Sequence, residues 1–393
     1  MTLSAPLRNT AVVDNVDDVI IFISDSVRYD SVPQTVKNQG ITAQAVAPST
    51  FTASSVPSIL TGQYPSGHQV WSFEDELDRP PALFTGPEDA VFDYDDEFHL
   101  QPEAISTPPR KSLDELESPY IYVYHDRGGH FPYGHSFESY PDMHSFFKEY
   151  NNKNTLRNLY TQSVESSAAR FLDLVERLED DGELENTLLV FLSDHGEILG
   201  EHGGLFTHAV PMVPELTEIP MVFAGTGLPE NRKLDILLSG TDIVPTVLSA
   251  LGREPPSRVD GVDLWGQFPD DERLVRSEVW KQTKYEHLKS YIAGSVWDKT
   301  GGYVSHTGSS LDRLIYSVGV HLMKGPHSSV ARTLSVSNYR DMFKAHLPSK
   351  IEYGQPGFEF SDALDEIPEF EQADRRTDHD VDRERLQQLG YLE

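Results

Sequence analysis

Short apolar runs that each end in a group of polar residues constrain the fold of this chain more than any other feature of its sequence. VIIFIS (19–24) is followed by DSVRYD, TLLVFL (187–192) by SDHGE, and YIYVY (120–124) by HDRGGH. Apolar runs of this length, rich in β-branched and aromatic residues, are typical of strands buried on both faces of a parallel sheet. The sequence therefore predicts a buried sheet with polar side chains at the carboxyl ends of its strands.

Helical patterns lie between these runs. The stretch 156–182 carries apolar residues at spacings of three and four, as one face of an amphipathic helix does. A fourth apolar run, EIPMVFAG (218–225), adds a strand, and 240–266 is typical of a short helix followed by a turn rich in Pro and Gly. Strands that alternate with helices predict an α/β fold, with a mostly parallel central sheet flanked by helices.

The composition of the chain changes at two places. Residues 72–117 are rich in Pro and in acidic residues and show weak periodicity, so we expect an inserted segment that covers the surface. The pattern changes again after residue 270. We therefore expect a catalytic domain at 1–270, and a smaller C-terminal subdomain with an acidic tail at 271–393.

The chain is strongly acidic, with 63 Asp and Glu against 32 Lys and Arg and a formal charge of −31. Such a surface repels polyanions, so nucleic acids and anionic membranes are poor partners. The composition is typical of a halophilic protein, in which concentrated salt screens the repulsion between surface charges.

The chain has no Cys, which excludes disulfides and thiolate chemistry. The sequence shows neither an apolar run long enough to span a membrane nor the pattern of a secretory signal. A cytoplasmic location without a transmembrane segment is therefore our expectation.

Asp25 and the pair Asp194-His195 each follow an apolar run. Because the carboxyl ends of parallel strands meet at one edge of a sheet, we expect these side chains to lie close together. Two carboxylates and an imidazole suit a divalent metal such as Zn²⁺ or Mn²⁺. A structural interpretation stays open, in which the Asp side chains cap turns and the His packs in the core.

Thr52 lies at the start of FTASSVPSILTGQYPSGH (51–68), a stretch that is dense in hydroxyls and has no Lys, Arg, Asp or Glu. A hydroxyl at the start of a helix and beside a metal is activated both by the metal and by the positive end of the helix dipole. Thr52 is therefore a candidate nucleophile. The competing interpretation is an ordinary N-cap for a helix at 53–61.

These residues occur within four ordered motifs of a known family. The chain resembles the sulfatase branch of the alkaline phosphatase superfamily over residues 17–270. The motifs are SDSVRYD, ILTGQYPSGH, SDHGEILGEHG and DIVPTVLSALG followed by VDGVDL, and the ending RLQQLGYLE resembles the family's usual tail. The resemblance implies an alkaline-phosphatase-like sandwich and a nucleophile at Thr52, ten residues before Gly62. The metal ligands that it implies are Asp25, Thr52, Asp194 and His195.

The residue at the nucleophile position decides the expected chemistry. Formylglycine sulfatases need Cys, or sometimes Ser, there, whereas the β-carbon of Thr52 carries a methyl group that prevents this conversion. Relatives with Thr at this position are nucleotide pyrophosphatase/phosphodiesterases and lipoteichoic acid synthases, which act on phosphate esters. The resemblance implies a metal-dependent hydrolase that cleaves small anionic phosphate mono- or diesters through a covalent phospho-threonine. Arg28, His130 and His208 are the residues expected to stabilise charge on the ester oxygens.

Three alternatives to this function stay open. The first alternative is a sulfatase that hydrolyses sulfate esters, and the second is a transferase of a phospho-headgroup. The third is an inactive family member that binds a ligand without turnover. Val56 and Ser26 favour the last, because they replace the Arg of the nucleophile motif and the second Asp of the first motif. His208 occupies the place of a sulfatase Lys that contacts the ester oxygens, and its competing interpretation is a surface residue.

The number of metals is also open. The second Asp of the family's first motif is replaced here by Ser26, and in this respect the chain resembles the single-metal members. This resemblance indicates one divalent ion of Mn, Zn, Ca or Mg. In contrast, Asp126 and His130 have the Asp-x-x-x-His spacing that contributes to a second zinc in alkaline phosphatases. His306, in SHTGSSL, resembles the residue that completes that site. The structural interpretation is that His130 precedes an aromatic turn and that His306 lies on a loop.

Overall fold

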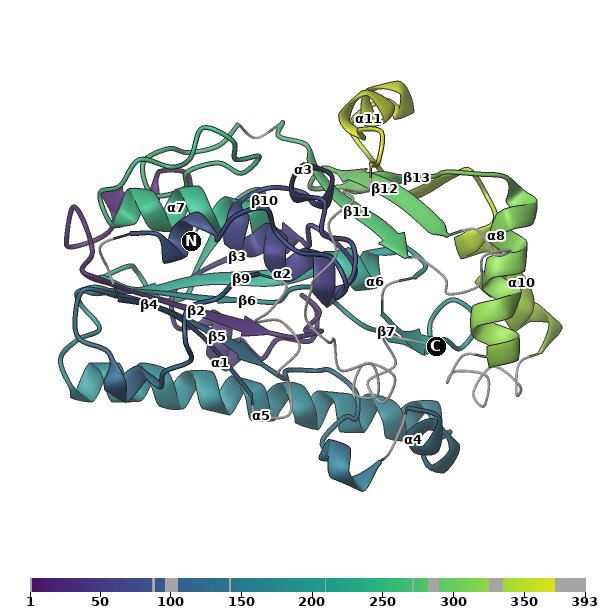
Figure 1. The fold of residues 1–393 in the computed structure, drawn as a ribbon, viewed down its shortest axis with the longest axis horizontal. Helices are drawn as coiled ribbons and strands as arrows, with labels where there is room; N and C mark the ends of the chain where they lie inside the picture. The colour runs from purple at the N-terminus through teal and green to yellow at the C-terminus, as the bar shows by residue number, and fades with distance from the viewer. Residues whose placement is uncertain are drawn as a thin grey trace.

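The structure of the chain is a computed structural model. It describes residues 2–86, 89–95, 105–140, 143–208, 210–270, 272–281, 290–324 and 335–371. The end of the expected acidic tail (372–393) lies outside the described residues, as do 87–88 and 96–104 of the expected insertion. Two sheets organise the described part of the chain: a large sheet with helices on both faces and a small sheet beside it (Figure 1).

The large sheet has eight strands. In spatial order they are β1 (Thr2–Leu3), β10 (Arg232–Ser239), β3 (Ile41–Val46), β9 (Glu218–Gly225), β6 (Thr187–Leu192), β2 (Asp18–Ser24), β5 (Tyr120–Asp126) and β4 (Asp89–Tyr94). β9 runs antiparallel to both of its neighbours, and all the other neighbouring pairs are parallel. The expected α/β fold with a mostly parallel central sheet is confirmed.

Apolar cores cover both faces of this sheet. Ile20 of β2 belongs to the core formed with α5 (Lys153–Asp180), whereas Ile21 belongs to the core formed with α2 (Thr52–Thr61) and α7 (Ile243–Ala250). Figure 1 shows α5 below the sheet and α2 and α7 above it. Because both faces are covered, every residue of β2 is buried, which explains the continuous apolar run.

The remaining helical segments are short. The α-helices are α1 (Gln34–Lys37), α3 (Pro65–His68), α4 (Met143–Glu149), α6 (Pro214–Thr217), α8 (Ser310–Ser317), α10 (Val336–His346) and α11 (Phe360–Glu366). Single 3-10 turns lie at Leu7–Asn9, Ala82–Phe84, Leu113–Glu115, Phe137–Ser139 and Gly240–Asp242, and a π-helical segment lies at Val318–Lys324. Within the described ranges, no helix has both the length and the apolar character needed to cross a bilayer.

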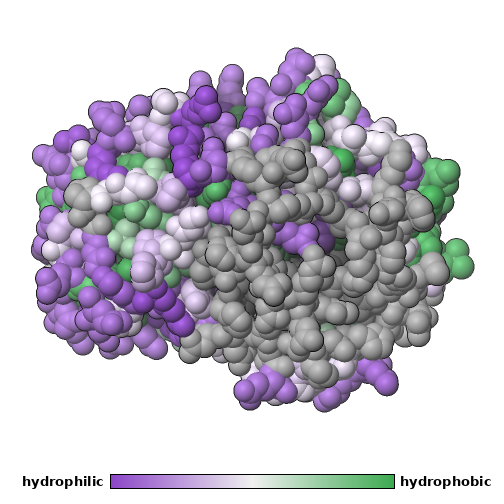
Figure 2. Space-filling model, in the orientation of Figure 1, coloured by the Kyte–Doolittle hydropathy of each residue, from purple (hydrophilic) through white to green (hydrophobic). Residues whose placement is uncertain are grey.

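The small sheet is antiparallel and consists of β11 (Val275–Lys281), β12 (Tyr291–Trp297), β13 (Gly301–His306) and β14 (Lys350–Gly354), in that order. It follows the expected division at residue 270 in the sequence. Figure 2 shows hydrophobic residues in green at the right of the view, the side on which Figure 1 shows α8 and α10. Leu311 of α8 and Val336 of α10 are exposed.

A buried carboxylate joins the small sheet to the large one. The backbone N–H of Glu278, on β11, donates to the carbonyl of Pro48 (2.9 Å), and its carboxylate accepts from the backbone N–H of Ser66 (2.7 Å). Pro48 lies in the loop that leads from β3 to α2, and Ser66 lies on α3. β11 is therefore fixed beside the start of α2.

The expected surface insertion at 72–117 contains a strand of the central sheet. β4 lies within that range and pairs in parallel with β5 at the edge of the large sheet. Phe92 at its centre is buried, and acidic residues stand at or near its ends. Because its apolar centre is short and lies among acidic and Pro residues, the sequence pattern did not indicate this strand. The expectation of a segment that covers the surface was therefore wrong for β4.

His346 on α10 gives the fold a predictable response to acid. Its Nδ1–H donates to the carbonyl of Met342 (2.9 Å), and its Nε2 lies 3.0 Å from Nε2 of His321. Burial lowers the pKa of His346 to about 4, below its value of 6.5 in the unfolded chain. The unfolded state therefore binds the extra proton first, so this stabilisation is complete above pH 6.5 and is lost as the pH falls toward 4.

We expect the free energy of unfolding to fall by roughly 1.4 kcal/mol per pH unit in this window from this one group. Urea unfolding of the wild type and of His346→Gln at pH 7.5, 6 and 5 measures it. The difference in stability between the two proteins is expected to shrink, or to change sign, as the pH falls. A constant difference across the three pH values would contradict the prediction.

Candidate active site

Three adjacent strands deliver polar side chains to one edge of the large sheet. β2 lies between β5 and β6, and the register pairs Ile23 with Leu192 on one side and Ser24 with Asp126 on the other. The residues that follow β2 and β6 therefore meet. Ligand atoms of Asp25, Asp194 and His195 all lie within 4.8 Å of one another, and all three side chains are fully buried.

Thr52 completes this group from the opposite side. Its Oγ1 donates to Oδ2 of Asp25 (3.2 Å) and lies 2.9 Å from Nε2 of His195. α2 begins at Thr52 itself, and Phe51 occupies the N-cap position. Thr52 is therefore not the N-cap of a helix at 53–61, because its hydroxyl faces the cluster from the first helical position, at the positive end of the helix dipole.

The cluster fits a single divalent cation. Oδ1 of Asp194 accepts from two backbone N–H groups, those of Ser26 (3.1 Å) and His195 (2.9 Å), whereas its Oδ2 is buried without a hydrogen-bond partner. Burial, followed by the nearby charge of Asp25, raises the pKa of Asp194. A buried carboxylate oxygen without a hydrogen bond is costly, and a bound cation removes that cost. The donor set of two carboxylates and an imidazole suits such an ion.

Ser26 positions both carboxylates of the cluster. It adopts a left-handed backbone conformation (φ 59°), which is uncommon for a residue with a side chain. In this conformation its Oγ donates to Oδ1 of Asp25 (2.6 Å) and its N–H to Asp194, while Tyr160 of α5 donates to its carbonyl (2.9 Å). The residue that replaces the family's second Asp thus orients the two remaining acidic residues.

The expected imidazoles lie together beside the cluster. The ring of His208 lies 5.3 Å from that of His195 and 5.1 Å from that of His130, measured between ring centroids. Burial lowers the pKa of His130 to about 4 and that of His208 to about 3. His208 is buried at the site, so its interpretation as a surface residue was wrong.

Sequence reasoning missed two residues of this site. Nε2 of His125, on β5, lies 3.3 Å from Oδ2 of Asp25. Glu197 is fully buried, and this burial raises its pKa to about 7. The hydroxyl of Tyr133 donates to Oε1 of Glu197 (2.6 Å), and Nδ1 of His208 lies 3.5 Å from its Oε2. Glu197 stood in the SDHGE motif, and His125 stood beside Asp126 at a strand end, so both were visible as candidates.

Arg28 has other partners than the ester oxygens that we expected it to contact. Its guanidinium donates to Asp30 (2.6 and 2.9 Å), to Glu201 (3.1 Å) and to the carbonyl of Glu197 (3.4 Å). These contacts join the loop after β2 to the loop after β6. We therefore infer a structural role for Arg28, because two carboxylates already share its charge.

The residues expected to hold a second zinc do not form a cluster. In the part of the chain that the structure describes, Asp25, Asp194 and His195 are the one group of three metal-ligating side chains. Asp126 accepts from Arg170 (2.6 and 2.9 Å), Ser167 (2.5 Å) and the backbone of Gly128 (2.8 Å). The expectation of a second zinc is therefore not supported at Asp126, because an arginine neutralises that carboxylate.

His306 is separated from the site by the fold. It lies at the end of β13 in the small sheet, where its Nε2 pairs with the hydroxyl of Tyr291 (2.6 Å) and its Nδ1 with the carbonyl of Pro348 (2.9 Å). Both ring nitrogens are thus engaged away from Asp126 and His130. The similarity of SHTGSSL to a zinc-site motif was misleading, because strand β13 pairs within the small sheet.

Removing Arg170 tests the structural role of Asp126. Arg170→Met leaves the carboxylate of Asp126 buried without its charged partner, and we expect a loss of roughly 2–4 kcal/mol, at the lower end because Arg170 is 41% exposed. Asp126→Asn together with Arg170→Met is expected to recover most of this loss. Urea unfolding of the single and double variants measures both effects. Equal stability of Arg170→Met and the wild type would contradict the ion pair.

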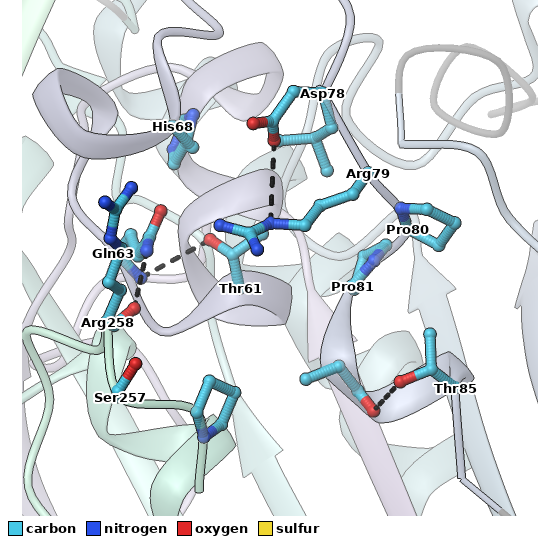
Figure 3. Close-up of a pocket in the computed structure, with 13 residues that line it drawn as sticks. Thr61, Gln63, His68, Asp78, Arg79, Pro80, Pro81, Thr85, Ser257 and Arg258 are labelled. Carbon is cyan, nitrogen blue, oxygen red and sulfur yellow. Dashed lines mark hydrogen bonds and ion pairs between the residues drawn. The ribbon is translucent and has the colours of Figure 1, made fainter.

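A separate cavity lies at the other end of α2. It has a volume of about 530 Å³, and Thr61, His68, Arg79 and Arg258 contribute to its walls. Figure 3 shows Thr61 in the last turn of the helix, with the side chains of Arg79 and Arg258 on either side of it. Thr52 opens the same helix, so this cavity lies about 13 Å from Thr52 along α2, and neither Thr52 nor a residue of the cluster lines it.

Comparisons with known proteins agree with this fold. The sulfatase family model matches residues 100–253. A Haloferax volcanii protein named low-salt glycan biosynthesis sulfotransferase Agl7 is 37% identical over 99% of this chain and 100% of its own length. A solved 2-O GAG sulfatase has a TM-score of 0.61 and 15% identity, over 74% of this chain and 83% of its own. The phosphonate monoester hydrolase of Agrobacterium radiobacter has a TM-score of 0.59 and 15% identity, over 74% and 87%.

The fold and the buried Asp-Asp-His cluster agree with the alkaline phosphatase superfamily, whose sulfatase-like members are ester-cleaving enzymes that use a divalent metal. Within that superfamily, the chain belongs to the sulfatase family. The predicted resemblance is confirmed.

Proposed function

We propose that this protein transfers a sulfuryl group through Thr52, taking it from a sulfate ester and passing it to a hydroxyl group of a glycan or to water. The observation that carries the proposal is the position of the Thr52 hydroxyl, within hydrogen-bonding distance of both Asp25 and His195. The relative of matching length supports the substrate class, because its name refers to a sulfotransferase of glycan biosynthesis.

The charge of the site supports a group with one negative charge. Asp25 and Asp194 together carry two negative charges, which one divalent cation balances. A sulfate ester or a phosphate diester adds one further charge, whereas a phosphate monoester adds nearly two at neutral pH. Among the described residues there is no second cluster of three metal-ligating side chains to balance that extra charge. The monoanionic esters are therefore the better match.

Asp25, Asp194 and His195 would hold the cation, and a divalent ion there would lower the pKa of the Thr52 hydroxyl and neutralise charge on the ester oxygens. Thr52 Oγ1 forms a bond to sulfur as the bond from sulfur to the ester oxygen breaks, and the proton of Thr52 ends on the leaving alcohol. His130 and His208, whose ring centroids lie 5.1 Å apart, are the side chains that we assign to carrying the proton between these oxygens.

The second step regenerates the enzyme. The hydroxyl oxygen of the acceptor forms a bond to sulfur, the bond from sulfur to Thr52 Oγ1 breaks, and the proton of the acceptor returns to Thr52. With a sugar hydroxyl as acceptor the product is a new sulfate ester, and with water it is inorganic sulfate. The full burial of Thr52 favours a chosen acceptor over bulk water.

Phosphate ester cleavage is the second candidate. Thr at the nucleophile position favours it, since the relatives that carry Thr there act on phosphate esters. The covalent intermediate would then be a phospho-threonine, and a phosphate diester would match the charge of the site as well as a sulfate ester does.

Covalent labelling separates the candidates. The metal-loaded protein is mixed with ³⁵S-labelled p-nitrophenyl sulfate or with ³²P-labelled bis-p-nitrophenyl phosphate, quenched in acid, and digested. We expect ³⁵S on the peptide that contains Thr52, no label in Thr52→Ala, and normal labelling in Thr61→Ala, whose hydroxyl lies at the other end of α2. Labelling by ³²P alone would favour the phosphate candidate, and bound metal without label or turnover would favour an inactive binding protein.

A further inference from the structure

Tyr160 connects the long helix α5 with the turn that carries the acidic cluster. Its side chain is buried, and its hydroxyl donates to the carbonyl of Ser26 (2.9 Å) and accepts from the backbone N–H of Arg28 (3.1 Å). One side chain thus holds the backbone on both sides of Val27. Tyr160 takes no part in the proposed transfer of the sulfuryl group, yet it contacts the residue that orients the acidic ligands.

The left-handed conformation of Ser26 is the reason why this contact matters. A residue with a side chain is strained at φ 59°, and it keeps such a conformation only where the surrounding structure holds it. In this conformation Ser26 donates from Oγ to Oδ1 of Asp25 (2.6 Å) and from its N–H to Oδ1 of Asp194 (3.1 Å). A relaxed turn would therefore withdraw donors from both carboxylates of the cluster.

Close packing fixes the ring of Tyr160 against this turn. The ring of Tyr133 lies edge-on to that of Tyr160, with centroids 5.7 Å apart and an angle of 89° between the planes. The N–H of Gly129 donates to the carbonyl of Asp25 (2.7 Å), and a Cβ at Gly129 would lie 2.5 Å from the ring of Tyr160. The backbone after β5 thus contacts both the turn and the ring, which keeps the Tyr160 hydroxyl directed at Ser26.

We propose that Tyr160 is a positioning residue for the divalent cation and that it acts through Ser26. Its hydroxyl holds the turn in which Ser26 orients the two carboxylate ligands before the cation binds. Hydrogen-bond partners of metal ligands tune metal affinity although they do not touch the ion. Figure 1 shows α5 along one face of the large sheet, so this helix becomes part of the metal site. The inference rests on the proposed function only for its cation, and it does not need Thr52 to cleave an ester.

Binding of Mn²⁺ to the full chain, stripped of metal with a chelator, provides a readout that does not need turnover. For Tyr160→Phe we expect the Kd in titration calorimetry to rise about tenfold, because the hydroxyl alone is lost. Tyr122→Phe is the matched control, since the buried hydroxyl of Tyr122 donates to Asp93 (2.5 Å) on the outermost strand of the sheet. Its Kd is expected to equal that of the wild type. Both variants lose a buried hydrogen bond, so a merely structural role predicts the same Kd for the two.

A double-variant cycle shows whether Tyr160 acts through Ser26. Gly adopts positive φ without strain, so Ser26→Gly keeps the turn and loses the hydroxyl that donates to Asp25. We expect its Kd for Mn²⁺ to rise about tenfold or more. Adding Tyr160→Phe to Ser26→Gly is expected to raise the Kd by less than about twofold further, because the turn no longer has to be held. An equal factor in both backgrounds would overturn the action through Ser26.

Turnover of p-nitrophenyl sulfate separates this inference from the proposed function. At limiting Mn²⁺ the rate of Tyr160→Phe is expected to fall about tenfold, and at saturating Mn²⁺ its kcat is expected to return to within about threefold of the wild type. A raised Kd in Tyr160→Phe, without Thr52-dependent turnover in the wild type, would overturn the proposed function and support Tyr160. An unchanged Kd in Tyr160→Phe, an equal rise in Tyr122→Phe, or no binding of Mn²⁺ by the wild type would overturn the role of Tyr160.

Discussion

Replacing Thr52 with Ala is expected to lower kcat/KM by roughly 10³- to 10⁵-fold, the range seen when an enzyme loses its nucleophile. The hydroxyl is the group within hydrogen-bonding distance of both Asp25 and His195, and no other hydroxyl is in contact with His195 Nε2 among the hydrogen bonds of the described residues. Without it, the proposed covalent intermediate cannot form. Thr52→Ser keeps the oxygen and is expected to retain at least about a tenth of the activity.

Initial rates with p-nitrophenyl sulfate and bis-p-nitrophenyl phosphate measure this effect. The melting temperature and the bound metal of each variant show whether the fold and the cluster persist. Thr61→Ala is the matched control, because Thr61 ends the same helix and donates to the carbonyl of Pro57 (2.7 Å). Turnover that survives in Thr52→Ala at the wild-type rate would mean that the nucleophile lies elsewhere.

Replacing Asp194 with Asn is expected to weaken metal binding by about 100-fold or more and to abolish turnover, since half of the negative charge of the cluster is lost. Asp126→Asn is the control, because Asp126 is a buried carboxylate at the end of β5 whose partner is Arg170. It is expected to lower stability but to keep both the metal affinity and a stoichiometry of one ion per chain. Titration calorimetry with Mn²⁺ and Zn²⁺ and metal analysis of dialysed protein measure these quantities.

Without the metal, Asp194→Asn is expected to stabilise the folded protein. Burial and the charge of Asp25 raise the pKa of Asp194, so the folded state favours its neutral form. The corresponding stabilisation is present at low pH and is lost as the pH rises above the unfolded value of 3.8. At pH 7 in a chelator, Asp194→Asn is therefore expected to melt at a higher temperature than the wild type. A second ion that disappears in Asp126→Asn, or a lower melting temperature of Asp194→Asn in the chelator, would contradict the single-cation cluster.

Much of the fold followed from local patterns. The apolar runs at 19–24 and 187–192 became the central strands β2 and β6, and the amphipathic stretch at 156–182 became α5. Burial of a strand on both faces requires apolar residues at every position, so a run of consecutive apolar residues predicts such a strand. The direction of a strand relative to its neighbours leaves no such local pattern, and the sequence therefore did not predict that β9 is antiparallel.

The meeting of Asp25, Asp194 and His195 was also determined by the sequence, since residues that follow parallel strands share one edge of a sheet. What each polar side chain pairs with was decided by packing between distant elements. Asp126 resembled a metal ligand until α5 brought Arg170 against it, and His306 resembled one until β13 placed it beside Tyr291. Charge pairing depends on distances of a few ångströms between segments far apart in the chain, and only the tertiary structure sets those distances.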